Sequence, residues 1–358
     1  MFGQPSVHSC VVKDTRVRKI KIVAVVGAGL MAVTLAAAPA LADPTGPTPP
    51  PYRELVGVGS ETTQDVMNGM ANAILNGAGT KIIGSYDAVP NPGTITTKDP
   101  ATQPQCQNIP RPSGSTNGVT ALVNDRAAGN NCIQFARSSA NSSSSFPGAG
   151  LTYVPFAVDA LTYMVRSDGS ISRRLTAAQL TTIYNCAGPA APTVPDATRV
   201  RPVLPQFGSG TRRSFLQSLG FTDAANFVTQ PSHTCIRDTD AGGEPLIENV
   251  GTELTDRREI APHSTAPYVA QLNTVVSDVR GLALLGHVNG VSSVSLNVNS
   301  PFRRDVYNVV PTSLLGTAPY NSTFVGPGSA ICSNNTIINQ FGFVPTANCG
   351  DTSIVTPG

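Results

Sequence analysis

Apolar residues occur along the chain in short runs, and stretches with helical periodicity follow several of these runs. A run at 54–59 ends in glycine and precedes apolar residues at helical spacing over 66–74. In the same way, a strand at 198–205 precedes a helix at 212–219. Strands that alternate with helices predict an α/β fold. Further strands are expected at 81–89, at 132–136 and, as a buried pair, at 151–165, and further helices at 119–123, 175–184 and 268–273.

The first 42 residues have the three parts of a secretory signal peptide. A basic stretch at 16–21 precedes an apolar run at 22–38, and Ala40-Leu41-Ala42 is a small-x-small cleavage site. A membrane anchor is the alternative, but the apolar run is short for a span. The sequence therefore predicts cleavage after Ala42 and a secreted or cell-envelope protein, in which residues 43–53 form a Pro-rich tether.

Removal of such a leader changes the charge of the chain. Residues 1–42 hold five of the 24 basic and one of the 22 acidic residues, which leaves 19 against 21, or about −2. A near-neutral chain gives no electrostatic reason to expect nucleic acid or an anionic membrane as partner. Trp is absent and aromatic residues make up 6% of the chain, which also disfavours a surface that stacks bases or sugars.

Six cysteines follow the leader, and an even number in an exported chain predicts disulfides. Six cysteines allow 15 pairings, of which nearest neighbours along the chain are the simplest. A zinc site is the alternative, but the sequence has no CxxC motif, so no metal is expected. The six residues are Cys106, Cys132, Cys186, Cys235, Cys332 and Cys349.

Several predicted strands end in turns rich in glycine and hydroxyl residues, at 59–63, 113–118, 137–139 and 208–211. A helix N-terminus offers unpaired N–H groups and partial positive charge, and glycine lets the backbone approach a ligand. Each turn by itself is more often an ordinary helix cap. Together, in a chain without the lysine of a phosphate loop, they predict a shared pocket for a small oxyanion and no cofactor.

Six segments resemble the phosphate-binding proteins of ABC importers, which have a two-lobed periplasmic-binding-protein-like (type 2) fold with a hinge and an interlobe ligand cleft. The resemblance covers roughly residues 54–275, and its segments lie at 57–66, 113–122, 135–139, 153–165, 175–185 and 207–215. It implies one lobe from 54–155 and 260–358 and a second from 156–259. It also implies an oxyanion ligand, an ABC importer as partner and a ligand site formed by Thr62, Thr63, Ser115, Ser209, Gly210 and Thr211.

Two departures from the family pattern concern the identity of the ligand. The family has Ser-Asp where this chain has Ser138-Ser139, and an arginine where this chain has Pro205. Loss of the aspartate removes the group that requires a protonated ligand, so a sulfate-like anion is an alternative to phosphate. Arg137 or Arg212 is expected to supply the missing positive charge, and an ordinary ion pair is the alternative for both.

Two other classes of function are considered. A secreted hydrolase would need a nucleophile and a base, but His233, His263 and His287 lie in no catalytic motif, and neither GxSxG nor HExxH occurs. A cell-surface adhesive or structural protein would fit the Pro-rich tether and the Ser/Asn-rich stretches. The sequence favours a monomeric binding protein without catalytic residues.

Overall fold

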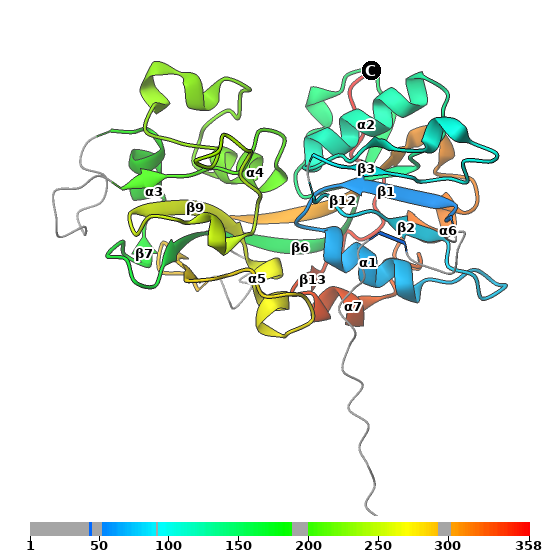
Figure 1. Ribbon diagram of the computed structural model, residues 1–358. Coiled ribbons are helices and arrows are strands. Elements are labelled where there is room, and N and C mark those ends of the chain that lie inside the picture. Colours follow the sequence, from blue (N-terminus) through cyan, green and yellow to red (C-terminus); the bar gives the residue numbers. More distant parts are fainter. Residues whose placement is uncertain (1–42, 45–51, 91, 188–199, 293–301) are drawn as a thin grey trace, which may run out of the picture. The chain divides into compact units, whose positions relative to one another are not determined.

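A mixed sheet organises the computed structural model, which describes residues 43–44, 52–90, 92–187, 200–292 and 302–358 (Figure 1). All of them belong to the unit formed by residues 37–358. The expected leader, 1–42, and residues 45–51 of the expected tether lie outside the described residues. None of the described helices is both long and apolar enough to cross a membrane.

The main sheet of the described chain has nine strands, and seven of them follow the order β2-β1-β5-β12-β6-β9-β8, with β10 and β13 also paired to β6. β1 is parallel to β2 and β5, whereas β12 is antiparallel to both β5 and β6. The strands are β1 (Leu55–Gly59), β2 (Ile83–Ser85), β5 (Phe135–Ser138), β6 (Leu151–Arg166), β8 (Arg201–Pro202), β9 (Glu259–Ser264), β10 (Ala283–Leu285), β12 (Arg303–Pro311) and β13 (Val344–Pro345). Two small sheets pair β3 (Thr94–Ile95) with β4 (Ile109–Pro110) and β7 (Arg174–Leu175) with β11 (His287–Val288).

The first five helices begin close to where the sequence predicts them, and α6 and α7 were not predicted. They are α1 (Gln64–Ala73), α2 (Ser115–Ala127), α3 (Ala177–Tyr184), α4 (Gly210–Ser218), α5 (Thr265–Leu272), α6 (Tyr320–Phe324) and α7 (Asn335–Gln340). Thr176 caps α3, because its side chain accepts from the N–H of Gln179 in a capping box. In Figure 1, α2 lies on one side of the sheet around β1, and α1 and α7 lie on the other.

The apolar stretch at 151–165 forms one strand and not the expected pair. β6 is 16 residues long, is buried up to its last residue and continues through Pro155 without a turn. Its register with β12 shifts between Val306 and Tyr307, opposite Pro155 and Ala157. A proline cannot donate to a sheet ladder, so a bulge is where it is tolerated.

β6 connects two parts of the hydrophobic core. One large buried cluster includes Leu55, Phe135 and Phe156, and another includes Leu161, Tyr184 and Phe215. The predicted lobe boundaries stay a prediction, and the cluster memberships differ from them in several places. Phe156 and Ala157 of the expected second lobe pack in the first cluster, and Ile260 of the expected first lobe packs in the second. Residues 288 and 302 pack in the second cluster, and residues 283 and 285 pack in a smaller cluster, in each case together with residues of the expected second lobe.

The three disulfides join nearest neighbours along the chain, which confirms the simplest pairing. Cys106 pairs with Cys132, Cys186 with Cys235, and Cys332 with Cys349. The loops that they close span 26, 49 and 17 residues. The first and third bridges contact the part of the core around β1 and β5, and the second contacts the part around β9.

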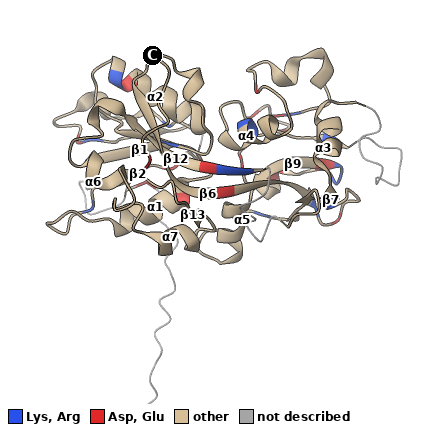
Figure 2. Cartoon of the chain, turned by 180° about the vertical axis from the view of Figure 1, so that it is seen from behind, with Lys and Arg blue, Asp and Glu red and all other residues tan. Residues whose placement is uncertain are grey.

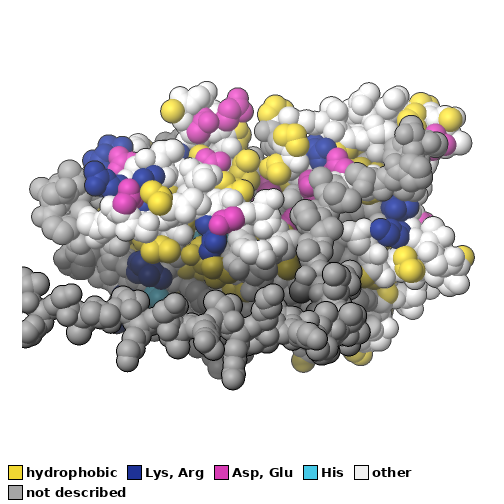
Figure 3. Space-filling view, turned by 60° about the horizontal axis from the view of Figure 1, so that its bottom comes forward, with side chains coloured by type: hydrophobic (Ala, Val, Ile, Leu, Met, Phe, Trp, Pro, Cys, Tyr) yellow, Lys and Arg dark blue, Asp and Glu magenta, His cyan; other side chains and the backbone are white. Residues whose placement is uncertain are grey.

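Charged residues occupy two different settings in the fold. On the face seen in Figure 3, basic and acidic side chains are interspersed, as expected for a near-neutral chain. Other charged residues lie in the middle of the sheet, where β6 and β12 run side by side (Figure 2). The register there places Arg304 opposite Asp159, and both side chains are buried. Buried charges need partners, so this part of the sheet is a candidate functional region.

Candidate functional site

The carboxylate of Glu248 lies between the N-terminal ends of two helices. Glu248 is 2% exposed. Its Oε1 accepts from the backbone N–H of Thr62 at 3.0 Å and from Thr62 Oγ1 at 2.7 Å. Its Oε2 accepts from the N–H of Thr211 at 3.0 Å and from the hydroxyl of Ser209. Two helix termini and two hydroxyls therefore surround one oxyanion, and we call these four donors the cradle.

Local structure explains how each helix presents its donors. β1 ends at Gly59, and Thr62 lies between that strand and the first turn of α1. Ser209 is the N-cap of α4, where its Oγ accepts from the N–H of Arg212 at 3.1 Å and donates to Glu248. Gly208 before it has φ +98°, a conformation that glycine adopts without strain. The N–H groups of Thr62 and Thr211 thus point at the same anion.

Arg304 supplies positive charge beside the cradle. Its Nη2 donates to Thr211 Oγ1 at 3.0 Å and lies 2.8 Å from Asp159 Oδ2. Ser264 Oγ also donates to Asp159, at 2.7 Å. Burial by itself would raise the pKa of Glu248, but Arg304 and the donors of the cradle outweigh it, so the pKa of Glu248 is lowered. The side chain therefore occupies the cradle as a carboxylate.

Two further hydroxyls lie next to the turn before α4. They belong to Ser115, at the start of α2, and to Ser139, which follows β5. Ser115 Oγ accepts from the N–H of Ser139 at 2.9 Å and lies 3.3 Å from Ser139 Oγ. A Cβ built on Gly210 would lie 2.3 Å from both hydroxyl oxygens, so only glycine fits between them. The N–H of Thr116 donates to the carbonyl of Gly208 at 3.0 Å. The N-terminal end of α2 therefore packs directly on the turn before α4.

The structure brings together most of the site expected from the sequence. Thr62, Ser209 and Thr211 bind the same carboxylate, and Ser115 and Ser139 contact Gly210. Residues from three strand-to-helix turns and one strand end therefore come together at the turn before α4. They are residues 62, 115, 139 and 209. Their role in binding a free ligand stays a prediction.

Four other candidates point elsewhere. Thr63 occupies the N-cap position of α1 without a side-chain cap bond, and the Ser138 hydroxyl donates to the carbonyl of Ala140 at 2.7 Å. Arg137 hydrogen-bonds to the Gly57 and Ser60 carbonyls and to Ser85 Oγ. Arg212 forms ion pairs with Asp223 and Asp238, the alternative considered for it. The positive charge expected from these two arginines is thus at Arg304.

Sequence reasoning missed Glu248, Asn249 and Arg304. The tandem Arg303-Arg304 before an apolar strand was an available signal, because two cations next to a buried run require partners. The loop at 247–250 carries no comparable signal. Asn249 has φ +64° and ties the loop to the site, since its Nδ2 donates to Thr62 Oγ1 at 3.0 Å and its Oδ1 accepts from the N–H of Ser264 at 2.8 Å.

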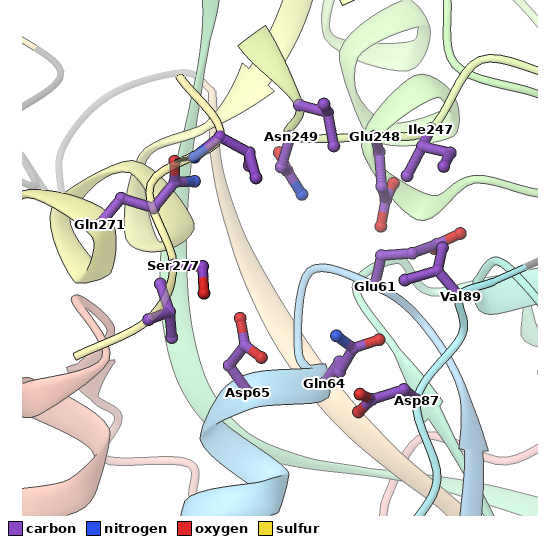
Figure 4. A pocket seen from close by; sticks show the side chains of 13 residues that line it. Glu61, Gln64, Asp65, Asp87, Val89, Ile247, Glu248, Asn249, Gln271 and Ser277 are labelled. Atoms are coloured by element: carbon purple, nitrogen blue, oxygen red, sulfur yellow. Dashed lines mark hydrogen bonds between the residues drawn. The ribbon is translucent and has the colours of Figure 1, made fainter. Parts of the chain in front are cut away.

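A cavity of about 340 Å³ lies beside the cradle (Figure 4). Four carboxylates line it, together with amides, a serine and apolar side chains: Glu61, Gln64, Asp65, Asp87, Val89, Ile247, Glu248, Asn249, Val250, Gln271, Val276, Ser277 and Val279. Burial, with the charge of Asp87, raises the pKa of Asp65 to about 6. Burial, with the charge of Glu248, raises the pKa of Glu61 to about 8. The cavity therefore holds protons near neutral pH.

These shifts predict that stability falls as the pH rises from 6.5 to 8. Unfolding lowers the pKa of Glu61 from about 8 to 4.5, so the folded state binds more protons in this window and loses stability as they leave. His263 acts in the opposite direction mainly between pH 4 and 6.5, because burial lowers its pKa from 6.5 to about 4. The loss across the window is at most about 2 kcal/mol. Melting temperatures measured at both pH values should differ in the wild type and converge in Glu61→Gln, and equal slopes in the two proteins would contradict the assignment.

The three histidines considered for catalysis have structural contacts. His233 stacks on Phe227 with ring centroids 4.0 Å apart, and its Nδ1 pairs with the Phe227 carbonyl. His263 is fully buried, with Nδ1 against the Ser264 carbonyl. His287 lies in β11. Within the described ranges, no group of three or more His, Cys, Asp or Glu residues could hold a metal ion.

Neither a family model nor a characterised protein matches this sequence. Solved structures do match its fold. One, described as a phosphate ABC transporter substrate-binding protein from Clostridium perfringens with bound phosphate, has a TM-score of 0.50 at 18% identity over 82% of this chain and 99% of its own. A second, described as a DING protein, has a TM-score of 0.50 at 12% identity over 84% of this chain and 96% of its own. The chain therefore has the mixed α/β fold of the two-lobed phosphate-binding proteins, as the sequence resemblance implied.

Proposed function

We propose that this protein is an extracytoplasmic solute-binding protein that captures a small oxyanion between two lobes and delivers it to an ABC importer. Phosphate is the first candidate, and a sulfate-like anion is the alternative. Capture needs a closing motion about a hinge and no catalysis. The role is one of binding rather than chemistry.

The observation that carries this proposal is the cradle. Its donors come from the turns before α1 and α4, on opposite sides of β6 in the sheet order, and they hold a carboxylate now. Donors that two helix termini hold in place, with Arg304 nearby, suit a small oxyanion that fits where the Glu248 carboxylate now lies. All four cradle groups donate, so nothing in the cradle itself requires a protonated ligand. This is why sulfate stays beside phosphate as a candidate.

A panel of anions tests the function, with protein made from the full coding sequence. Phosphate, sulfate, molybdate and small dicarboxylates are added separately, and the melting temperature is followed. A ligand at 100 times its dissociation constant adds about 2.7 kcal/mol to the stability of the folded state. We expect a shift with at least one tetrahedral oxyanion. No shift with any anion, in the wild type or the variants below, would refute the proposal.

A serine pair adds a site-specific arm to this test. Ser115 hydrogen-bonds to Ser139 and not to Glu248, so Ser115→Ala removes a candidate ligand contact without altering the bonds of the carboxylate. A lost hydrogen bond to a charged ligand costs about 1.5–3 kcal/mol, or roughly 10- to 150-fold in affinity. Ser138→Ala is the matched control, because the Ser138 hydroxyl is bonded within its own loop. Equal affinities in the two variants would exclude Ser115 from the site.

A further inference from the structure

We infer that Glu248 is a built-in competitor for the oxyanion site, a carboxylate of the chain that fills the cradle and that a free ligand must displace. This inference rests on the proposed function and concerns the same donors. It assigns to Glu248 the role of setting both the affinity and the selectivity of the site.

The first argument is that the cradle is saturated. Each oxygen of Glu248 accepts one backbone N–H and one hydroxyl, from Thr62 on one side and from Ser209 and Thr211 on the other. These are the groups that a phosphate or sulfate would use. Because each N–H donates along one direction, Glu248 and a free anion cannot both occupy the cradle. Binding of one therefore excludes the other.

The second argument is that displacement needs a side-chain movement and no unfolding. The backbone before Glu248 is fixed, since the carbonyl of Leu246 accepts from the N–H of Gln206 at 2.9 Å and the N–H of Leu246 donates to the carbonyl of Asp238 at 3.0 Å. After Glu248, the side chain of Asn249 is bonded to Ser264 and Thr62. Glu248 itself lines the cavity of about 340 Å³ beside the cradle (Figure 4). The side chain can therefore leave the cradle within an unchanged loop.

The third argument concerns selectivity. A tethered group competes at an effective concentration that reaches the millimolar range or more. A free monocarboxylate offers the cradle the same two oxygens as Glu248 but is not held near it. Glu248 therefore outcompetes a free monocarboxylate for the cradle donors. A dianion gains more than Glu248 does from Arg304 and from the two helix termini, because the attraction grows with charge. The competitor thus rejects monocarboxylates and admits more highly charged oxyanions, which is selection against the wrong ligand.

The test compares the wild type with Glu248→Ala and Glu248→Gln by calorimetric titration with phosphate, sulfate and acetate. If the carboxylate fills the cradle nine times in ten, its removal tightens the apparent affinity for phosphate or sulfate by about tenfold. We expect at least this change in both variants. Acetate should bind and stabilise Glu248→Ala, by taking the place of the missing carboxylate, and should leave the wild type unchanged.

Asp65→Asn is the matched control for charge. Asp65 lines the same cavity, so this variant removes one negative charge near the site but leaves the cradle occupied. A similar gain in Asp65→Asn and Glu248→Gln would mean that general electrostatics explains the effect, and it would overturn the inference. If the alanine variant does not fold, the glutamine variant, which keeps the shape of the side chain, carries the comparison.

Other outcomes separate the inference from the function on which it rests. Equal phosphate affinity in the wild type and both Glu248 variants would overturn the inference and leave the function standing. Loss of phosphate binding in folded Glu248 variants would also overturn it, because Glu248 would then contact the bound ligand. If acetate stabilises Glu248→Ala but no protein binds phosphate or sulfate, the proposed function fails although Glu248 is still shown to fill the cradle.

Discussion

Replacing Arg304 with methionine should lower the free energy of unfolding by about 3–5 kcal/mol, because it leaves a buried charge without its partner. The side chain of Asp159 is fully buried, and its ion pair with Arg304 is 2.8 Å long. Glu248 loses the same neighbouring cation, so two carboxylates are destabilised by one substitution. Denaturant unfolding, followed by circular dichroism, measures the change. Anion binding should fall as well, since Arg304 contacts Thr211 in the cradle.

The preceding residue provides the control for this prediction. The Arg303 side chain is 39% exposed and lies 3.5 Å from Asp305, so Arg303→Met should cost less than about 1 kcal/mol. The double variant Arg304→Met with Asp159→Asn should recover part of the loss, because the buried carboxylate is then neutral. A loss of similar size at both arginines would show that chain stiffness or packing matters here more than the buried ion pair.

Replacing Gly210 with alanine should displace the turn before α4 from the end of α2. The added Cβ would lie 2.3 Å from Ser115 Oγ and from Ser139 Oγ, far inside contact distance. Overpacking of this kind costs about 1–3 kcal/mol. Because Ser209 and Thr211 flank Gly210, the cradle donors move with it, and we expect oxyanion-dependent stabilisation to be lost. Thermal melts with and without phosphate report both effects.

Two comparisons isolate the clash as the cause. Gly77→Ala is the matched control, because a Cβ at Gly77 has no neighbour within 4 Å. In Gly210→Ala combined with Ser115→Ala and Ser139→Ala, both clashing hydroxyls are absent, and the nearest remaining atom is Ser115 Cβ at 3.1 Å. This triple variant should regain most of the stability. If it stays as unstable as Gly210→Ala alone, helix geometry and not the clash explains the loss.

The sequence predicted the parts of the site that depend on local chemistry. Glycine and hydroxyl residues between a strand and a helix have a local function at the helix N-terminus, so the turns at 59–63 and 208–211 were visible in the residue order. The same reasoning did not predict the partners that Arg137 and Arg212 have in the structure, and their role in ligand binding stays a prediction. Which acceptor an arginine reaches depends on strands and loops distant in the sequence, such as the loops that hold Asp223 and Asp238.

The parts that could not be predicted depend on long-range register. Arg304 reaches the cradle because β12 pairs with β6 in a register that places it opposite Asp159, 145 residues earlier. Glu248 is 186 residues from Thr62 and lies in a loop without periodicity. No local pattern encodes either contact. The single long strand at 151–166 was missed for a related reason, because a nearly continuous apolar run fits one strand as well as two.

The placement of the disulfides stabilises each part of the core without linking the two sides of the cradle covalently. The two cysteines of each bridge pack in the same part of the core, and none of the three bridges joins the elements before α1 to those around α4. Oxidation therefore stiffens each half independently and adds no covalent tie across the cradle. In the proposed function, resistance to unfolding can rise in this way without slowing the opening that release of an oxyanion would require.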